Sequence, residues 1–110
     1  GKTESWNGTN WTELNDMNSA RRSLAGAGTN SATIVFGGNT TTIVALTEEW
    51  NGVSWVEVAD LSTARTGLGG SGATSGSTAS LAFAGEAPPP SAASEEWSGS
   101  STTTKTISTD

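Results

Sequence analysis

Apolar residues occur in short runs separated by Gly, Ser, Thr and Asn along the whole chain. Ala32–Gly38 (ATIVFGG) is a brief apolar run that ends in a glycine pair, which predicts a buried strand followed by a chain reversal. Around Val56–Val58, apolar and acidic side chains alternate, as in a strand with one solvated face. No window carries apolar residues at i, i+3, i+4 and i+7, so no amphipathic helix is expected. The pattern predicts an all-β fold.

The predicted strands fall into groups of four. The best-defined group has a Gly-rich first strand of small side chains, which suits a crowded innermost position. Between its third and fourth strands stands Asn51-Gly52, matched by Asn7-Gly8 earlier and by the weaker Ser98-Gly99 later. Asn-Gly predicts a type I′ hairpin turn, because both central residues of that turn need positive φ. The four strands of this group are expected at Ser23–Thr29, Ala32–Gly38, Thr47–Trp50 and Ser54–Val58.

The chain repeats itself with a spacing of roughly 44–47 residues. Thr3–Thr29 aligns without a gap on Thr47–Ala73, and about half of the positions are identical. The similarity then continues at a slightly longer spacing, because ATIVFGG recurs as ASLAFAG. Such self-similarity is the signature of a repeat fold. The matched pairs include Trp6 and Trp50, Trp11 and Trp55, Arg21 and Arg65, Leu24 and Leu68, and Glu48-Glu49-Trp50 with Glu95-Glu96-Trp97.

Composition and charge narrow the possible functions. The 110 residues carry a formal net charge of −6 with only five Lys and Arg, which argues against nucleic acid and against an anionic membrane surface as partners. No apolar stretch approaches the roughly 20 residues of a membrane span. The chain has no Cys and no His, which removes disulfides, thiolate nucleophiles, imidazole bases and the usual zinc sites. We therefore expect a protein without cofactor or metal that is not an enzyme.

The repeat resembles the kelch family of β-propeller repeats. In that family an apolar strand ends in Gly-Gly, an aromatic residue follows, and a Trp closes the unit; Gly37-Gly38, Trp50 and Trp55 match this order. Three departures are that Trp50 stands where Tyr is commoner, that Ala84-Gly85 replaces the second glycine pair, and that Thr102 replaces the last closing Trp. The resemblance implies propeller blades of four antiparallel strands, and it specifies a fold rather than a function.

The strand count implies an incomplete ring in one chain. Residues 1–14 would form half a blade (the outer hairpin), residues 20–58 a full blade and residues 64–108 another. Closed propellers need about four to eight blades, so the ring must be completed by copies of the chain or by the remainder of a longer chain. If copies assemble head-to-tail, the hairpin Thr3–Leu14 is a candidate to complete a blade begun by a neighbour's Gly67–Gly85, in competition with that neighbour's own Glu95–Ile107.

The repeated charged and aromatic residues have structural explanations first. We expect one acid of each Glu-Glu pair to be solvated and the other to pair with Arg, because adjacent strand residues point to opposite faces. Arg21 and Arg65 are expected at a seam between blades, bound to Asp16, Asp60 or backbone carbonyls of an adjacent blade; a ring of arginines that binds an anion is the alternative. The repeated tryptophans are also expected to pack in the core and at the seams, with stacking on sugars as the alternative. They are Trp6, Trp11, Trp50, Trp55 and Trp97.

Two loops are the candidate binding surface. Asn39–Leu46 and Gly85–Ala93 occupy the same place in the two units, between the second and third strands, and differ most between them. Variable loops on a regular scaffold are where binding residues concentrate. The candidate residues are Asn39, Thr40, Thr41, Pro88, Pro89 and Pro90.

A narrower resemblance bears on the source of the chain. The chain is similar to repeat proteins of marine bacteriophages and environmental sequences. The similarity lies in the segments TEEWNG, SWVEV and ADLSTAR and in the polar tail STTTKTISTD. It implies a virion fibre, decoration or adhesion protein at a virion or extracellular surface, with a glycan or protein ligand. The alternative is a protein-interaction or carbohydrate-binding propeller of a cellular protein. A copper-radical enzyme on a kelch fold needs Tyr, His and Cys, which this chain lacks.

Overall fold

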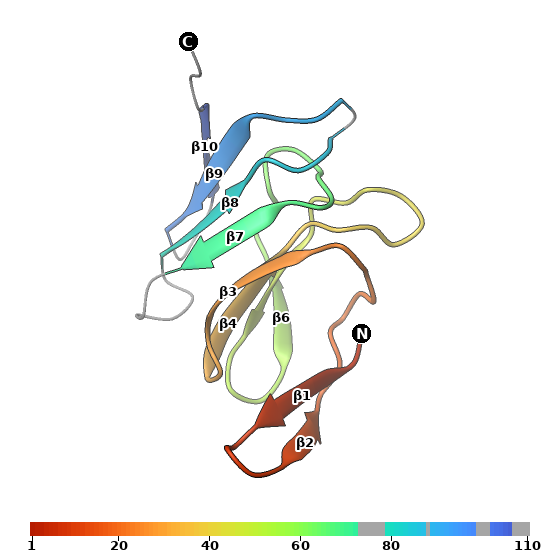
Figure 1. The fold of residues 1–110 in the computed structure, drawn as a ribbon, viewed down its shortest axis with the longest axis vertical. Coiled ribbons are helices and arrows are strands. Elements are labelled where there is room, and N and C mark those ends of the chain that lie inside the picture. Colours follow the sequence, from red (N-terminus) through yellow and green to blue (C-terminus); the bar gives the residue numbers. More distant parts are fainter. Residues whose placement is uncertain (73–78, 88, 99–101, 107–110) are drawn as a thin grey trace.

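The computed structural model describes residues 1–72, 79–87, 89–98 and 102–106, and these form ten β-strands and no helix (Figure 1). The predicted all-β fold is therefore confirmed. The strands are β1 (Thr3–Trp6), β2 (Trp11–Leu14), β3 (Ala25–Thr29), β4 (Ala32–Phe36), β5 (Thr47–Trp50), β6 (Trp55–Val58), β7 (Gly69–Gly72), β8 (Ser80–Phe83), β9 (Ala93–Trp97) and β10 (Thr102–Thr106).

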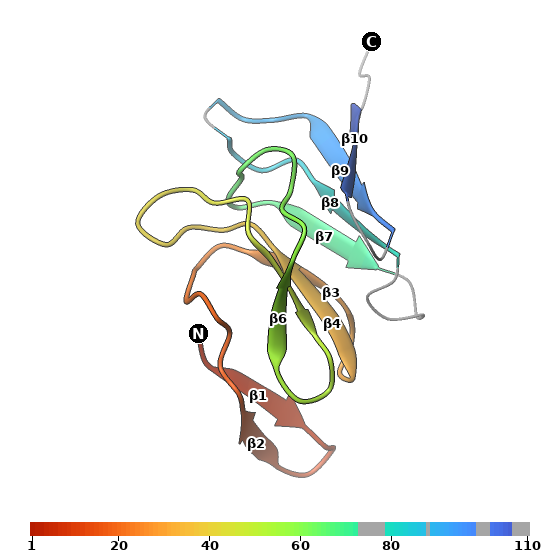
Figure 2. The same ribbon diagram turned by 180° about the vertical axis from the view of Figure 1, so that it is seen from behind.

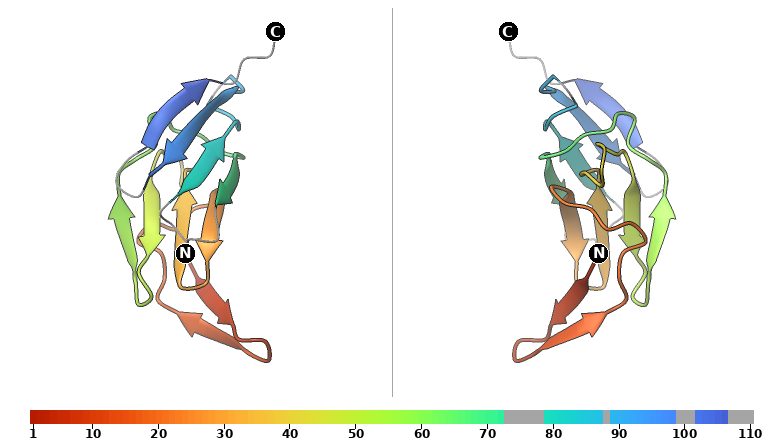
Figure 3. Two further views of the ribbon diagram at one scale, coloured as in Figure 1. Left: turned by 90° about the vertical axis from the view of Figure 1, so that its left-hand side faces the viewer. Right: turned by 90° about the vertical axis from the view of Figure 1, so that its right-hand side faces the viewer.

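The strands make three antiparallel sheets in which each strand pairs with its neighbour in sequence. They are the hairpin β1–β2, the sheet β3–β4–β5–β6 and the sheet β7–β8–β9–β10. The predicted strands are present, although β3, β4 and β6 are shorter than the patterns that predicted them. The sheets do not close on one another (Figure 3). Of the predicted elements, Gly99, Ile107 and the boundary at 108 lie outside the described residues.

The turns at Asn7-Gly8 and Asn51-Gly52 are not the type I′ turns that the sequence predicted. Trp6 pairs with Trp11, and Trp50 pairs with Trp55, so each connection has four residues. Gly8 and Gly52 have φ of 96° and 98°, whereas the asparagines before them do not have positive φ. Each asparagine side chain instead accepts two backbone N–H bonds from its own loop, at 2.7–2.9 Å. The side chain thus shapes the loop as an Asx turn.

The three sheets are stacked in chain order and enclose two cores (Figure 3). One core joins the N-terminal hairpin to β3–β6: Val35, Trp50 and Trp55 pack with Leu14, Met17 and Leu24. The other joins β3–β6 to β7–β10. The apolar face of a single sheet would be exposed to water. Stacking the sheets on one another buries these faces and so stabilises each sheet. The second core consists of Ala25, Ile34, Phe36, Leu61, Leu68, Ala82 and Trp97.

The Gly-rich first strands β3 and β7 contact each other, and their small residues are sterically required. A Cβ added at Gly72 would lie 2.8 Å from the Cβ of Ala27, and one at Gly70 would lie 3.1 Å from the Cβ of Ala25. Larger side chains would force the sheets apart. The predicted crowding at these first strands is confirmed.

Candidate functional site

A buried ion pair fixes the segment before β3 to the loop between β4 and β5. The Arg21 guanidinium donates to Glu48 Oε2 at 2.8 Å and to the backbone oxygens of Gly37 and Leu46 at 2.7 and 2.6 Å. Both charged side chains are almost wholly buried. Glu48 Oε1 also accepts the backbone N–H of Asn18 at 2.7 Å. One arginine therefore holds together both ends of the loop, the strand β5 and the incoming chain.

The same network recurs in the next unit. Arg65 donates to Glu95 Oε2 at 3.0 Å and to the backbone oxygens of Ala84 and Ala93 at 3.1 and 2.9 Å. Glu95 accepts the backbone N–H of Ser62, as Glu48 accepts that of Asn18. Charge-assisted bonds of this kind in a buried site are strong and geometrically specific. The two units therefore share the same Arg–Glu hydrogen-bond network at equivalent positions.

The arginine partners differ in part from those predicted. The acids are Glu48 and Glu95, whereas Asp16 and Asp60 are exposed. The longer glutamate side chain projects from the middle of its sheet into the space where the guanidinium lies. The backbone carbonyls that bind each arginine belong to the sheet that follows it, not to an adjacent one. Each arginine is fully enclosed, so neither presents a surface to an anion.

The two Glu-Glu pairs divide as the strand geometry predicts. Glu48 and Glu95 are buried against arginine. Glu49 is half-buried, and Glu96 is exposed. Since successive side chains alternate between the two faces of a strand, the acids of a pair do not converge on one ligand. Within the described residues, no group of three or more carboxylates is arranged to hold a metal ion.

The glycine pair Gly37-Gly38 lies where the two units meet. Both residues have positive φ, at 61° and 100°. A Cβ on Gly37 would lie 2.5 Å from the backbone oxygen of Arg65, and Gly38 donates its N–H to that same oxygen at 2.8 Å. The pair is required by its backbone conformation and by the close approach of the next unit.

The two candidate loops share one backbone. Val44 N–H bonds to Gly38 O at 3.0 Å in the first loop, and Ser91 N–H bonds to Gly85 O at 2.9 Å in the second. Asn39 exchanges two backbone bonds with Arg22, just as Glu86 does with Thr66. Both loops project from the same side of the molecule (Figures 1 and 2). These backbone bonds match while the side chains differ, so the described parts of the loops carry different side chains on a similar frame.

The candidate residues of these loops differ in exposure. Asn39 and Thr40 are half-buried, because Asn39 belongs to the bridge with Arg22. Thr41 is exposed at the tip. Pro89 and Pro90 are exposed in the second loop, while Pro88 lies outside the described residues. The surfaces open to a ligand are therefore the tips around Thr41 and Pro89.

The five tryptophans do not share one environment. Trp50, Trp55 and Trp97 are buried and pack between sheets, as predicted. Trp6 and Trp11 form the same tilted pair, with ring centroids 5.3 Å apart against 5.5 Å for Trp50 and Trp55. Their exposed fractions are nevertheless 47% and 65%. For Trp6 and Trp11 the predicted packing is not seen, because none of the described strands covers that face of the N-terminal hairpin.

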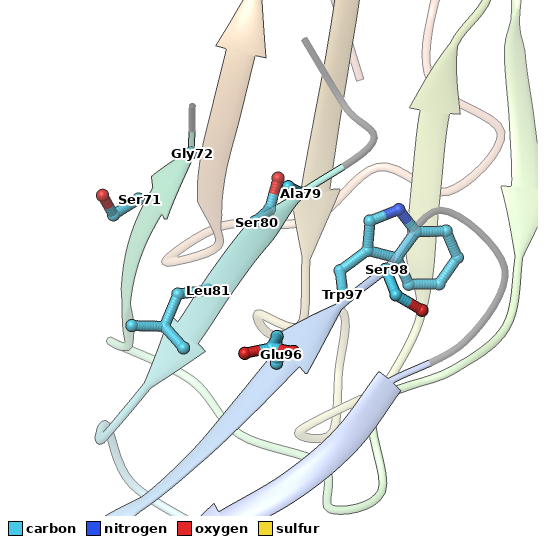
Figure 4. A pocket seen from close by; sticks show the side chains of 8 residues that line it. All are labelled: Ser71, Gly72, Ala79, Ser80, Leu81, Glu96, Trp97 and Ser98. Atoms are coloured by element: carbon cyan, nitrogen blue, oxygen red, sulfur yellow. The ribbon is translucent and has the colours of Figure 1, made fainter. Parts of the chain in front are cut away.

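Among the hollows on the described surface, two lie at the outer sheets. One, of about 300 Å³, runs beside β1 and is lined by residues of the hairpin and of β3–β6, among them Glu4, Trp6, Thr33 and Trp50. The other is an open hollow of about 600 Å³ on β7, β8 and β9 (Figure 4). Neither hollow was predicted from the sequence, because each depends on which strands lie side by side in three dimensions. The second is lined by Ser71, Gly72, Ala79, Ser80, Leu81, Glu96, Trp97 and Ser98.

Comparison with protein-family models and with curated proteins finds no match to this chain. In the part of the chain that the structure describes, no helix is long and apolar enough to cross a bilayer.

Proposed function

We propose that the chain is a non-catalytic, kelch-like β-propeller module in which each four-stranded sheet is one blade. The module serves as part of a virion fibre, decoration or adhesion protein at a virion or extracellular surface. Its ring is completed by copies of the chain or by the remainder of a longer chain. Support for the blade assignment comes from the strand order, the repeated Arg–Glu networks and the face-to-face stacking of successive sheets.

The observation that carries the binding role is the pair of matched loops. The backbone bonds from Val44 to Gly38 and from Ser91 to Gly85 repeat, while the side chains between them change, with Pro89-Pro90 at the positions of Thr42-Ile43. A scaffold that keeps its frame and varies its exposed loops is typical of binding proteins. The ligand class is a glycan or a protein, since the chain is acidic overall and offers no basic surface to an anionic polymer.

Two measurements test this function. The folded chain is first applied to arrays of glycans and of surface proteins, together with the variants T40A/T41A and P89A/P90A. We expect binding that the loop variants reduce at least tenfold without a change in the urea midpoint. Light scattering then gives the molar mass, for which we expect a multiple of 11.1 kDa. A monomer that binds no ligand on either array contradicts the proposal.

Carbohydrate binding by the N-terminal hairpin is a second candidate. Trp6 and Trp11 expose adjacent indole rings, and such rings stack on the C–H faces of sugars. In that case W11A removes glycan binding while the loop variants retain it. Loss in the loop variants and retention in W11A would assign the binding to the loops instead.

A further inference from the structure

The N-terminal hairpin has an open edge. In the two larger sheets the third strand pairs with the second, so that Glu48 lies opposite Val35 and Glu95 opposite Ala82. The matching strand of the hairpin is β1, and within the described residues it pairs only with β2. Its second side therefore presents unpaired backbone groups, which is the usual template for strand addition.

A groove follows this open edge. It has a volume of about 300 Å³ and is lined on one side by Glu4 and Trp6 of β1. Thr33, Trp50 and Trp55 of the next sheet line its other side. In the stack, a first and second strand of a blade would lie at this place, beside β1 and over the sheet β3–β6. The groove is thus the seat of a missing strand pair.

Glu4 adds a charge requirement to this seat. It occupies the position of Glu48 and Glu95, since Trp6 matches Trp50 and Trp97 two residues further on. Those two glutamates are buried on an arginine that precedes the first strand of their own sheet. Glu4 is exposed and makes no ion pair with an arginine among the residues described. The strand pair that fills the groove is therefore expected to carry an arginine ahead of it.

We infer that the occupant is the strand pair β7–β8 of a second copy, with the partner's Arg65 bound to Glu4. The hairpin then replaces the β9–β10 strands of that second copy, and each chain gives its hairpin to the next. This inference rests on the proposed function, because it specifies how copies of the chain complete the ring.

In the exchange, the hairpin β1–β2 replaces the equivalent hairpin β9–β10 of the second copy. The cross-strand pair Trp6–Trp11 of β1–β2 has the same register position as the pair Trp97–Thr102 of β9–β10. In the sheet β3–β6 this position is held by Trp50–Trp55. In the exchanged blade Glu4 takes the place of Glu95, and Trp6 that of Trp97. Trp11 and Leu14 of the hairpin stand where β9–β10 has Thr102 and Lys105. The exchange thus gains apolar burial, and swapping identical elements between copies costs little.

The exchange also covers the face of β8 that carries Leu81 and Phe83. Ile34 and Phe36 are fully buried because β7–β10 lies over them. Their counterparts Leu81 and Phe83 are half-exposed, and Leu81 lines the open hollow (Figure 4). When β7–β8 of the second copy enters the groove, these two side chains face the sheet β3–β6 of the chain that supplies the hairpin. The contact is head-to-tail, so it closes into a ring when its rotation allows.

Paired cysteine variants test the exchange, because the natural chain has no cysteine. Leu81 lies opposite Glu96 in the sheet, and Ser5 matches Glu96 in the repeat. Opposite residues of antiparallel strands are within disulfide range. S5C/L81C therefore links chains only when the hairpin is exchanged, whereas L81C/E96C links within one chain only when β9 stays in place. Non-reducing gels and intact masses of the oxidised proteins distinguish the two results.

Removal of the Glu4 charge provides an independent readout. E4Q should weaken self-association about ten- to a hundredfold, because it takes a charged partner from an enclosed arginine. The matched control is E13Q, since Glu13 lies opposite Glu4 on the same hairpin and is bound to the exposed Lys2. E13Q should leave association unchanged, and circular dichroism should show that both variants remain folded.

The outcomes separate the two proposals. Interchain links in S5C/L81C with weaker association of E4Q support the exchange. An oligomer that links only through L81C/E96C overturns the exchange and leaves the proposed assembly in place. A monomer whose loops still bind a ligand overturns the exchange and self-assembly, but leaves the binding role.

Discussion

At the scale of single residues, the repeat places the same unusual backbone at the same positions. Ala84 has φ of 59° where Gly37 has 61°, and Ser23 has φ of 55° where Gly67 has 63°. The left-handed region costs a residue with a Cβ roughly 1–2 kcal/mol relative to glycine. Two of the four positions are therefore filled by residues that carry this cost.

Replacing Ala84 by Gly should raise the free energy of unfolding by about 1 kcal/mol, because it relieves the left-handed conformation. Ser23→Gly should act in the same direction. Urea unfolding followed by tryptophan fluorescence measures both. The control is Ala82→Gly in β8, which removes a buried methyl group and should destabilise. If Ala84→Gly lowers stability as the control does, the backbone explanation is wrong.

Gly37→Ala and Gly67→Ala separate backbone strain from crowding. The two glycines have nearly equal φ, 61° and 63°. An added Cβ at Gly37 would lie 2.5 Å from Arg65 O, whereas one at Gly67 would meet no atom within 4 Å. We expect Gly67→Ala to cost about 1 kcal/mol and Gly37→Ala at least about 2 kcal/mol more. Equal losses in urea unfolding would show that the approach of the next sheet does not matter.

At the scale of elements, the buried Arg–Glu pair organises each unit. It ties the segment before the first strand to the third strand and to both ends of the intervening loop. A buried pair of this kind often adds little over apolar residues of the same shape, but it is costly to break. Its role is to fix one geometry, and through it the course of the tip loops.

Glu48→Gln and Glu95→Gln should each lower the free energy of unfolding by about 3–5 kcal/mol, since each leaves an arginine buried without its counter-charge. Glu49→Gln and Glu96→Gln are the matched controls, because each changes the neighbouring residue by the same chemistry at a more exposed position. The controls should cost less than about 0.5 kcal/mol. Similar losses for both sets in urea unfolding would contradict the structural role of the pair.

At the scale of the whole molecule, the stack of sheets ends in two uncovered faces. One carries Trp6 and Trp11, and the other carries Leu81 and Phe83. A protein seldom leaves large apolar side chains at repeated core positions open to water unless another surface covers them. This imbalance supports a role for the chain within a larger ring.

The Trp55→Ala and Trp11→Ala variants should lose different amounts of stability, because Trp55 is buried and Trp11 is exposed. Trp55 is buried and donates its indole N–H to Thr3 at 2.9 Å, so its loss should cost about 3–5 kcal/mol at any protein concentration. Trp11→Ala should hardly change the stability of dilute chains, but should abolish the rise in melting temperature with concentration that assembly produces. A melting temperature of the natural chain that is independent of concentration would contradict this expectation.

The sequence by itself determined the strand positions and the repeat, because both depend on local patterns of apolar residues, glycine and asparagine. It predicted that one glutamate of each pair would bind arginine, and it named the tip loops. It did not identify Glu48 and Glu95 as those glutamates, and it mistook the type of the Asn-Gly turns. Partner choice and loop length depend on which side chains meet in three dimensions.

Only the tertiary structure showed that Trp6 and Trp50, equivalent in sequence, have opposite environments. The residues around each tryptophan along the chain are nearly the same, so sequence reasoning assigned both to a core. Whether a sheet face is buried depends on the presence of the next sheet, which is a property of the stack rather than of the repeat. The open edge of β1, the groove beside it and the absence of a described arginine beside Glu4 have that same physical cause.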